Sequence, residues 1–165
     1  MRIGLLLLFL GTAAISGLAH ADLDGEIYSS EEWRVSLKTP KAWRLSERSS
    51  YPNILLWMTH RQPNARMLFA AEMLPEEQDS QSYALLAVKK LEQLGFRVRA
   101  PQLHSATGAY WMDFDNGESF LRQAVLVPAE SGIGYSLTLS AETLRARGQM
   151  LRAFDFSLRS LKPKR

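Results

Sequence analysis

Residues 109–127 read AYWMDFDNGESFLRQAVLV, and this stretch decides the fold class. Ala109 to Asp115 is rich in aromatic and apolar residues, which is typical of a β-strand. Asn116 and Gly117 both tolerate positive φ angles, and a two-residue type I′ turn between two strands requires such residues. Residues 119–127 then supply the partner strand. The stretch therefore predicts a β-hairpin, and with it an antiparallel sheet.

A two-residue turn fixes which side chains face each other across this hairpin. It places Asp115 opposite Glu118, Trp111 opposite Arg122 and Asp113 opposite Phe120. The more polar of the two hairpin faces then carries a candidate binding site made of Trp111, Asp113, Phe120 and Arg122. The core face carries Tyr110, Met112, Phe114 and Leu121. An aromatic pair beside charged groups is typical of a partner-binding surface. The alternatives are an ordinary cross-strand cluster, or a face that the last segment or a loop covers.

Shorter patterns predict the remaining strands. Trp33, Val35 and Leu37 alternate with polar residues, and Pro40 ends that first strand. Two later apolar runs flank a polar loop at 61–64 and should pair as a hairpin. The strands predicted outside the 109–127 hairpin are residues 33–38, 53–60, 67–74, 97–103 and 134–139. The last of these alternates between apolar and small polar side chains, which indicates a sheet with one solvent-exposed face and helices on the other.

Two helices are predicted to cover the sheet. In the first, the apolar side chains from Tyr83 to Leu94 recur at helical spacing, with Asp79 or Ser80 as the N-cap and Gly95 just past the last turn. The second begins after Ser140 as N-cap. Its predicted buried stripe is Leu144, Gly148 and Leu151. Over residues 154–161 the apolar spacing fits either a helix or a strand, and periodicity alone does not decide between them.

These elements predict an α+β domain over residues 31–161, with an antiparallel sheet of about six or seven strands and two main helices packed on one face. Four short motifs support a family resemblance: residues 40–43 (PKAW), 107–110 (TGAY), 134–138 (GYSLT) and 151–154 (LRAF). Through them the chain resembles the PsbP-like superfamily, which includes the photosystem II extrinsic subunit PsbP and bacterial envelope relatives such as DcrB. The chain has Ala42 where these proteins often have glycine, and it lacks the lipid-bearing cysteine of several envelope members. The resemblance implies a non-enzymatic binding or assembly protein.

The N-terminus reads as a secretory signal peptide at residues 1–21. Arg2 is followed by an apolar run and a small-residue exit, so cleavage is expected after Ala21. The alternative is that the segment is retained as a membrane anchor, because residues 3–19 carry no charge. An N-terminal arm at 22–30 and a basic tail at 162–165 complete the predicted organisation. We expect a periplasmic or secreted protein, with membrane contact only if the signal segment is retained.

Composition excludes several chemistries. The chain has no cysteine, which rules out disulfides, thiolate nucleophiles and lipid attachment to cysteine. Without Arg2, 19 basic side chains remain against 17 acidic ones, and outside the tail they are spread along the sequence. Nucleic-acid binding would need a concentrated basic stripe, so we expect no nucleic-acid partner.

Candidate catalytic and metal-binding motifs are weak. Residues 113–118 (DFDNGE) are rich in oxygen ligands, but the glycine is not where a calcium-binding EF-hand loop needs it, and a hairpin tip explains the run better. Beyond the signal segment the only histidines are His60 and His104, without metal-binding spacing. No Gly-x-Ser-x-Gly motif is present. We therefore predict no catalytic residues, no metal and no cofactor.

Taken together, these features predict an exported, non-catalytic binding or assembly protein of the bacterial envelope that acts through one sheet face. Its partner is expected to be another envelope protein of unknown identity. The alternative is a small periplasmic hydrolase with an unrecognised carboxylate site, which a buried acid beside a deep pocket would favour.

Overall fold

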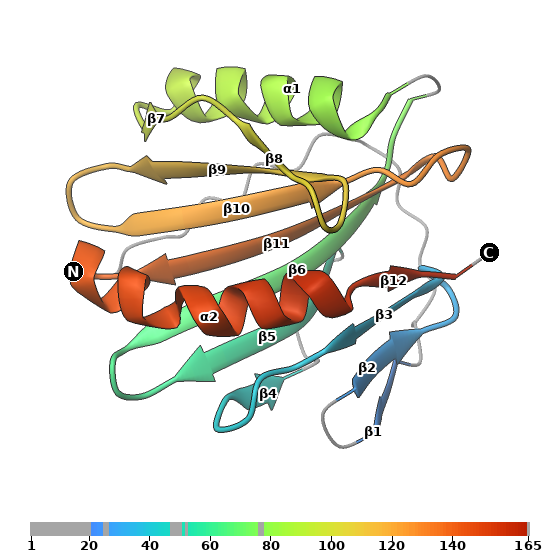
Figure 1. Ribbon diagram of the computed structural model, residues 1–165, viewed down its shortest axis with the longest axis horizontal. Helices are drawn as coiled ribbons and strands as arrows, with labels where there is room; N and C mark the ends of the chain where they lie inside the picture. The colour runs from blue at the N-terminus through green and yellow to red at the C-terminus, as the bar shows by residue number, and fades with distance from the viewer. Residues whose placement is uncertain (1–20, 25–26, 47–50, 52, 76–77, 165) are drawn as a thin grey trace.

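The computed structural model describes residues 21–24, 27–46, 51, 53–75 and 78–164 (Figure 1). Its larger sheet has eight antiparallel strands in the order β4-β5-β6-β11-β10-β9-β7, with β8 also paired to β9. These strands are β4 (Arg44–Ser46), β5 (Ile54–His60), β6 (Ala65–Met73), β7 (Arg97–Val98), β8 (Gln102–His104), β9 (Ala109–Asp115), β10 (Phe120–Leu126) and β11 (Ile133–Ala141). The predicted α+β class with an antiparallel sheet is confirmed.

A smaller sheet lies beside the first and joins the two ends of the described chain. Its strands, in the order β1-β2-β3-β12, are β1 (Ala21–Asp24), β2 (Ile27–Ser30), β3 (Val35–Lys38) and β12 (Lys162–Pro163). The predicted basic tail therefore begins as a strand paired with β3. Its Lys164 Nζ donates to Ser29 Oγ over 2.9 Å. Of the predicted signal peptide, residues 1–20 lie outside the described residues.

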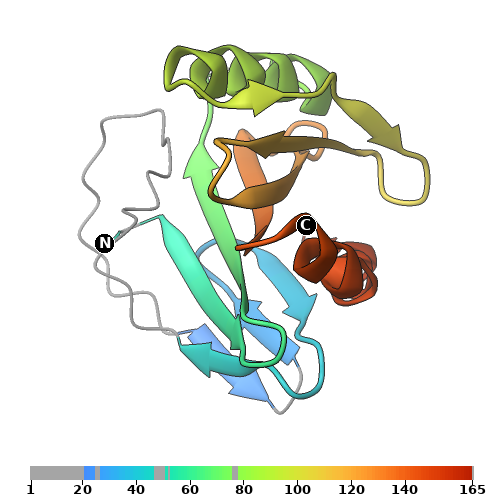
Figure 2. The ribbon, with the colours of Figure 1, turned by 90° about the vertical axis from the view of Figure 1, so that its left-hand side faces the viewer.

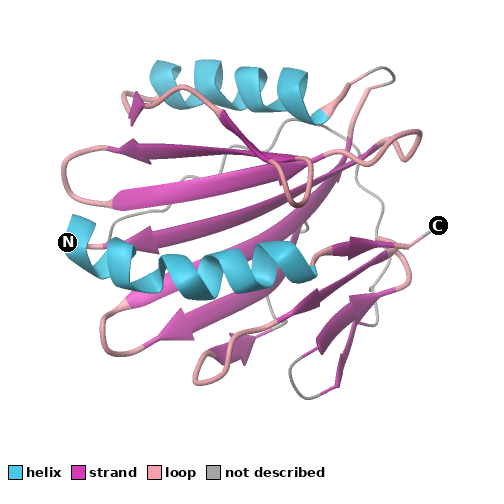
Figure 3. Cartoon of the chain, in the orientation of Figure 1, coloured by secondary structure: helices cyan, strands magenta, loops and turns pink. Residues whose placement is uncertain are grey.

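The two helices, α1 (Ser80–Gln93) and α2 (Leu144–Ser160), pack on opposite faces of the larger sheet (Figures 2 and 3). Met112 and Phe114 of β9 pack in one buried cluster with α1, whereas Trp111 of the same strand packs toward the cluster that contains Phe154 of α2. Successive residues of a strand point to opposite faces. The prediction that both helices cover one face is therefore wrong, because β9 presents apolar side chains on both of its sides.

The prediction of one solvent-exposed face along the last long strand is also wrong. β11 lies in the interior of the sheet between β6 and β10, and all of its residues except Ser140 are buried. On its polar side Thr138 Oγ1 accepts a hydrogen bond from Gln123 Nε2 over 3.0 Å. On its apolar side Tyr135 stacks on Phe69, with ring centroids 6.2 Å apart, and its hydroxyl donates to the Trp33 carbonyl in the connection between β2 and β3. The polar side chain of Thr138 is therefore paired with a side chain of the neighbouring strand β10 inside the fold.

The 109–127 hairpin forms as predicted, but its turn and register differ. Asp115 pairs with Phe120, which leaves a four-residue connection at 116–119. Gly117 has positive φ, whereas Asn116 does not. Asn116 instead accepts the amide hydrogens of Glu118 and Ser119 with its side-chain oxygen, at 3.1 and 2.9 Å. A side chain that caps the turn thus replaces the expected two-residue type I′ geometry.

The predicted strand at 97–103 is divided in two. β7 and β8 pair with different parts of β9, and Arg99, Ala100 and Pro101 separate them. Proline lacks the backbone N–H that a continuous ladder would need. The 53–60 and 67–74 strands form the predicted hairpin as β5 and β6.

Helix α1 confirms its predicted ends. Asp79 is the N-cap and accepts the Ser82 amide hydrogen over 2.7 Å, and Gly95 follows the last turn with φ of 85°. Helix α2 differs from the prediction, since Thr143 rather than Ser140 is its N-cap. Its buried side includes Arg147, Phe154 and Leu158, whereas Leu144 and Gly148 of the predicted stripe are exposed. The ambiguous segment from residue 154 onward is helical to Ser160.

The turn before Trp43 holds a residue in a strained conformation. The Trp43 amide donates to the Pro40 carbonyl over 3.4 Å, and Ala42 occupies the third position of this turn with φ of 67°. Glycine is favoured at that position of a type II turn because a Cβ atom disfavours positive φ. This is the position where the PsbP-like pattern often has glycine.

We expect Ala42→Gly to stabilise the fold by about 0.5–1 kcal/mol. A left-handed residue with a Cβ costs about 1–2 kcal/mol, and the greater unfolded-state freedom of glycine offsets part of the relief. Urea unfolding monitored by tryptophan fluorescence measures the change. Ala129→Gly is the control, because Ala129 is exposed in a turn without positive φ. A lower urea midpoint for Ala42→Gly would contradict the strain.

Candidate functional site

The predicted site residues lie on the α2 side of β9 and β10, where a charged cluster joins three of them, Trp111, Asp113 and Arg122. Arg122 Nε and Nη2 donate to the two Asp113 carboxylate oxygens over 2.7 and 2.9 Å, and Arg147 Nη1 of α2 lies 2.8 Å from Oδ1. The Arg122 Cζ also lies 3.9 Å from the centroid of the Trp111 ring. We call Trp111, Asp113, Arg122 and Arg147 the Asp113 cluster.

The register change alters the predicted cross-strand pairs, but the four side chains still lie on one face of the sheet. Arg122 lies opposite Asp113 rather than Trp111, and Trp111 lies opposite Ala124. The observed shift is by two residues, so each side chain keeps its face. Asp113 is buried at 7% exposure, while Trp111, Phe120 and Arg122 are each partly exposed. α2 therefore covers the carboxylate and leaves part of the aromatic and guanidinium surface accessible.

Positive charge exceeds negative charge in the Asp113 cluster, since two guanidinium groups contact one carboxylate. Burial alone would raise the pKa of Asp113. The hydrogen bond and charge of Arg122, together with Arg147, outweigh burial and hold the pKa of Asp113 below its usual value. The group is thus a fixed anion that orients two arginines. An ionised, doubly paired carboxylate is a poor proton acceptor at neutral pH, so this geometry suits recognition rather than general base catalysis.

Stability should fall in acid because of this pairing. Asp155 also has a lowered pKa, because hydrogen bonds from Arg159 and His104 outweigh the effect of burial. A lowered folded-state pKa stabilises the fold above the unfolded-state value near 3.8, and this contribution is lost as the pH falls through the folded-state pKa. We expect a nearly constant urea midpoint from pH 7 to about 5 and a decline below about pH 4. A midpoint that stays unchanged down to pH 3 would contradict these shifts.

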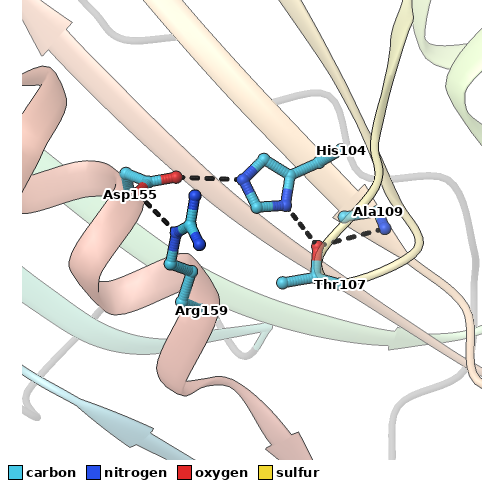
Figure 4. Close-up of polar contacts among 5 residues, drawn as sticks. All are labelled: His104, Thr107, Ala109, Asp155 and Arg159. Carbon is cyan, nitrogen blue, oxygen red and sulfur yellow. Dashed lines mark hydrogen bonds and ion pairs between the residues drawn. The ribbon is translucent and has the colours of Figure 1, made fainter.

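A second polar cluster links the β8–β9 connection to α2 (Figure 4). His104 Nδ1 lies 2.9 Å from Thr107 Oγ1, and Nε2 lies 2.9 Å from Asp155 Oδ1. Arg159 Nε donates to the other Asp155 oxygen over 2.6 Å. No sequence pattern predicted this contact, because His104 and Asp155 are 51 residues apart. Only the short His104–Thr107 spacing was visible locally.

Hydroxyl, imidazole and carboxylate groups in series invite comparison with a hydrolase triad. In that arrangement the imidazole Nε2 faces the nucleophile and Nδ1 faces the acid. Here the order is reversed. Thr107 Oγ1 also accepts the Ala109 amide hydrogen over 3.3 Å, which ties the hydroxyl to its own turn. We interpret these contacts as a structural link between the hairpin and the helix.

The buried carboxylates cannot act as an acid and base pair. Glu72 of β6 is 5% exposed and accepts a hydrogen bond from the Tyr83 hydroxyl of α1. Burial and the Glu72 charge raise the pKa of Tyr83 well above its ordinary value, so the phenol stays protonated. Glu72 lies on the α1 face, whereas Asp113 lies on the α2 face. The sheet separates the two groups.

Three of the oxygen-bearing side chains in the run at 113–118 are engaged within the protein. Asp113 binds the two arginines, Asp115 pairs with Arg97, and the Asn116 oxygen caps the turn. Among the described residues, no group of three or more histidine and acidic side chains is placed to hold a metal ion. His60 Nδ1 lies 3.1 Å from the Pro63 carbonyl, and its ring packs on Trp43. In the part of the chain that the structure describes, no helix is long and apolar enough to cross a membrane.

No family model and no curated protein sequence matches this chain. Solved structures do resemble it. The chain is similar to cyanobacterial PsbP from Synechocystis sp. PCC 6803, with a TM-score of 0.59, 13% identity, and coverage of 93% of this chain and 98% of that protein. It is similar to the Saccharomyces cerevisiae Ran-binding protein Mog1p, with a TM-score of 0.63, 7% identity, and coverage of 88% and 96%.

A third similar structure is LpqN, which is involved in cell envelope biogenesis of Mycobacterium tuberculosis. Its TM-score is 0.58 at 18% identity, with 78% of this chain and 82% of LpqN covered. The chain therefore has the PsbP-like fold, as the four sequence motifs predicted. At these sequence identities the similarity shows the fold, and the function has to be inferred from the residues of the site.

Proposed function

We propose that this protein is an exported, non-catalytic binding or assembly protein of the bacterial envelope. It would contact a partner protein through the α2-side face of β9 and β10, at Trp111, Asp113, Phe120 and Arg122. The signal peptide at residues 1–21, cleaved after Ala21, would deliver it to the periplasm or the exterior. Two proteins of similar fold support a binding role, since one is a Ran-binding protein and another takes part in envelope biogenesis.

The observation that carries this proposal is the stacked Trp111–Arg122 pair. Asp113 holds Arg122 through two hydrogen bonds, so the guanidinium is already positioned over the indole ring before any partner binds. Both side chains remain partly exposed. Preorganised aromatic and arginine side chains lose little conformational entropy on binding, and these residue types dominate the energetics of protein interfaces. Phe120 on the same face adds apolar area.

A crosslinking pull-down from the envelope tests the proposal. The tagged native protein should capture a defined protein that Trp111→Ala and Arg122→Gln fail to capture. Trp57→Ala is the matched control, because Trp57 is also partly exposed but lies on the other face of the sheet. Each variant is first checked for native unfolding behaviour. If folded Trp111→Ala and Arg122→Gln variants capture the same proteins as the native chain, the face is not the binding site.

A further inference from the structure

The outer side of α2 carries a row of basic side chains. Arg145, Arg152 and Arg159 are exposed and spaced seven residues apart. Seven residues turn an α-helix by about 20° less than two full turns and advance it by about 10.5 Å, so the three side chains line up along the helix. Leu144, 54% exposed, and Phe156, 44% exposed, flank the row on its two sides. We call these five residues the α2 ridge.

Basic charge is concentrated in this part of the chain. Residues 142–165 contain seven of the 20 basic side chains but only two of the 17 acidic ones, Glu142 and Asp155. The seven are Arg145, Arg147, Arg152, Arg159, Lys162, Lys164 and Arg165. The preceding residues therefore carry a net negative formal charge. We expected the charge to be spread along the chain apart from the basic tail at 162–165, but the four arginines of α2 extend that basic segment.

Several of these cations are available to an outside ligand. Arg147 points inward to Asp113, Lys164 pairs with Glu31, and Arg159 pairs with Asp155. Within the described residues, the side chains of Arg145, Arg152 and Lys162 form no hydrogen bond or ion pair. A cation without a partner on an exposed helix can neutralise an anionic surface without first breaking an internal contact.

We propose that the α2 ridge docks on an anionic phospholipid surface, with the arginine row on the headgroups and Phe156 and Leu144 at the boundary of the acyl region. Basic helices with exposed aromatic and leucine side chains bind in this way, and each basic side chain near such a surface adds to the affinity. The combination of apolar side chains on both flanks with a row of cations favours a lipid surface over an acidic protein. α2 lies on the same side of the sheet as the β9–β10 face, so docking would hold that face toward the membrane (Figure 2).

Co-sedimentation with vesicles tests this inference. The full chain is expressed, and the protein is used in the form in which the cell processes it. Vesicles of pure phosphatidylcholine are compared with vesicles containing phosphatidylglycerol at about one third. The native protein should bind the anionic vesicles more strongly, and salt should weaken that preference. The native protein and the variants below carry the same N-terminus, so comparing them on anionic vesicles separates the ridge from any contribution of Arg2 and the apolar N-terminal segment.

Arg145→Glu/Arg152→Glu should lower partitioning to anionic vesicles at least about tenfold and leave phosphatidylcholine binding unchanged. The matched control is Arg66→Glu/Lys89→Glu, which makes the same charge change at exposed positions away from the α2 side. It should retain most of the preference. Native protein without any preference for anionic vesicles, or equal losses in the two double variants, would overturn the proposal. The first of these results would favour an acidic protein as the ligand of the ridge.

Discussion

Asp113→Asn is expected to cost about 3 kcal/mol of folding free energy. Arg122 and Arg147 would then remain beside a neutral amide, with side chains only 18% and 11% exposed. Removal of one partner from a buried ionic group leaves uncompensated charge, which typically costs about 3–5 kcal/mol, and the residual exposure of the arginines places the estimate at the lower end. Equilibrium urea unfolding at pH 7 measures the loss.

Asp115→Asn provides the matched control, two residues further along the same strand. Asp115 pairs with Arg97, whose side chain is 74% exposed, so its loss should cost less than about 1 kcal/mol. Arg147→Met combined with Asp113→Asn should recover part of the stability, because one unpaired guanidinium is removed. Similar losses for Asp113→Asn and Asp115→Asn would show that the Asp113 cluster does not organise this face.

Phe154→Ala is expected to cost about 3–5 kcal/mol, the usual loss for a phenylalanine removed from a core. Phe154 is 3% exposed and packs with Leu158 against the sheet. Phe156→Ala should change stability by no more than about 0.5 kcal/mol, because that ring is 44% exposed. The pair separates the two interpretations that the sequence left open, since a strand would place both rings on one side. Equal losses for the two variants would contradict the helix.

Much of the sheet was predictable because strand signals are local. The 109–115 and 120–126 strands and the β5–β6 hairpin follow from apolar runs bounded by turn residues. The register of the β9–β10 hairpin was not predictable, because it depends on whether Asn116 adopts a positive φ in a two-residue turn or caps a longer turn with its side-chain oxygen. The faces of β9 were also ambiguous, since both Trp111 and Met112 are apolar enough to be buried. Only the placement of the two helices shows that both sides are covered.

The candidate site was predictable in part. Local register reasoning placed Trp111, Asp113, Phe120 and Arg122 on one face, because a shift of two residues preserves the face. It could not predict Arg147, which arrives from α2 and shares Asp113 with Arg122. Nor could it predict the link between His104 and Asp155. Both contacts depend on how α2 docks on the sheet, and no short sequence pattern carries that information.

Site-specific photo-crosslinking in the living cell is the most direct test of whether the α2-side face of β9 and β10 binds a partner protein. Benzoylphenylalanine at position 120 replaces a partly exposed phenylalanine of the face, and the same group at position 85 replaces Leu85, which is exposed on α1. We predict one discrete crosslinked protein for position 120 that is missing for position 85 and is lost when Arg122→Gln is added. Equal adducts at both positions, or none at position 120, would contradict the proposed binding face.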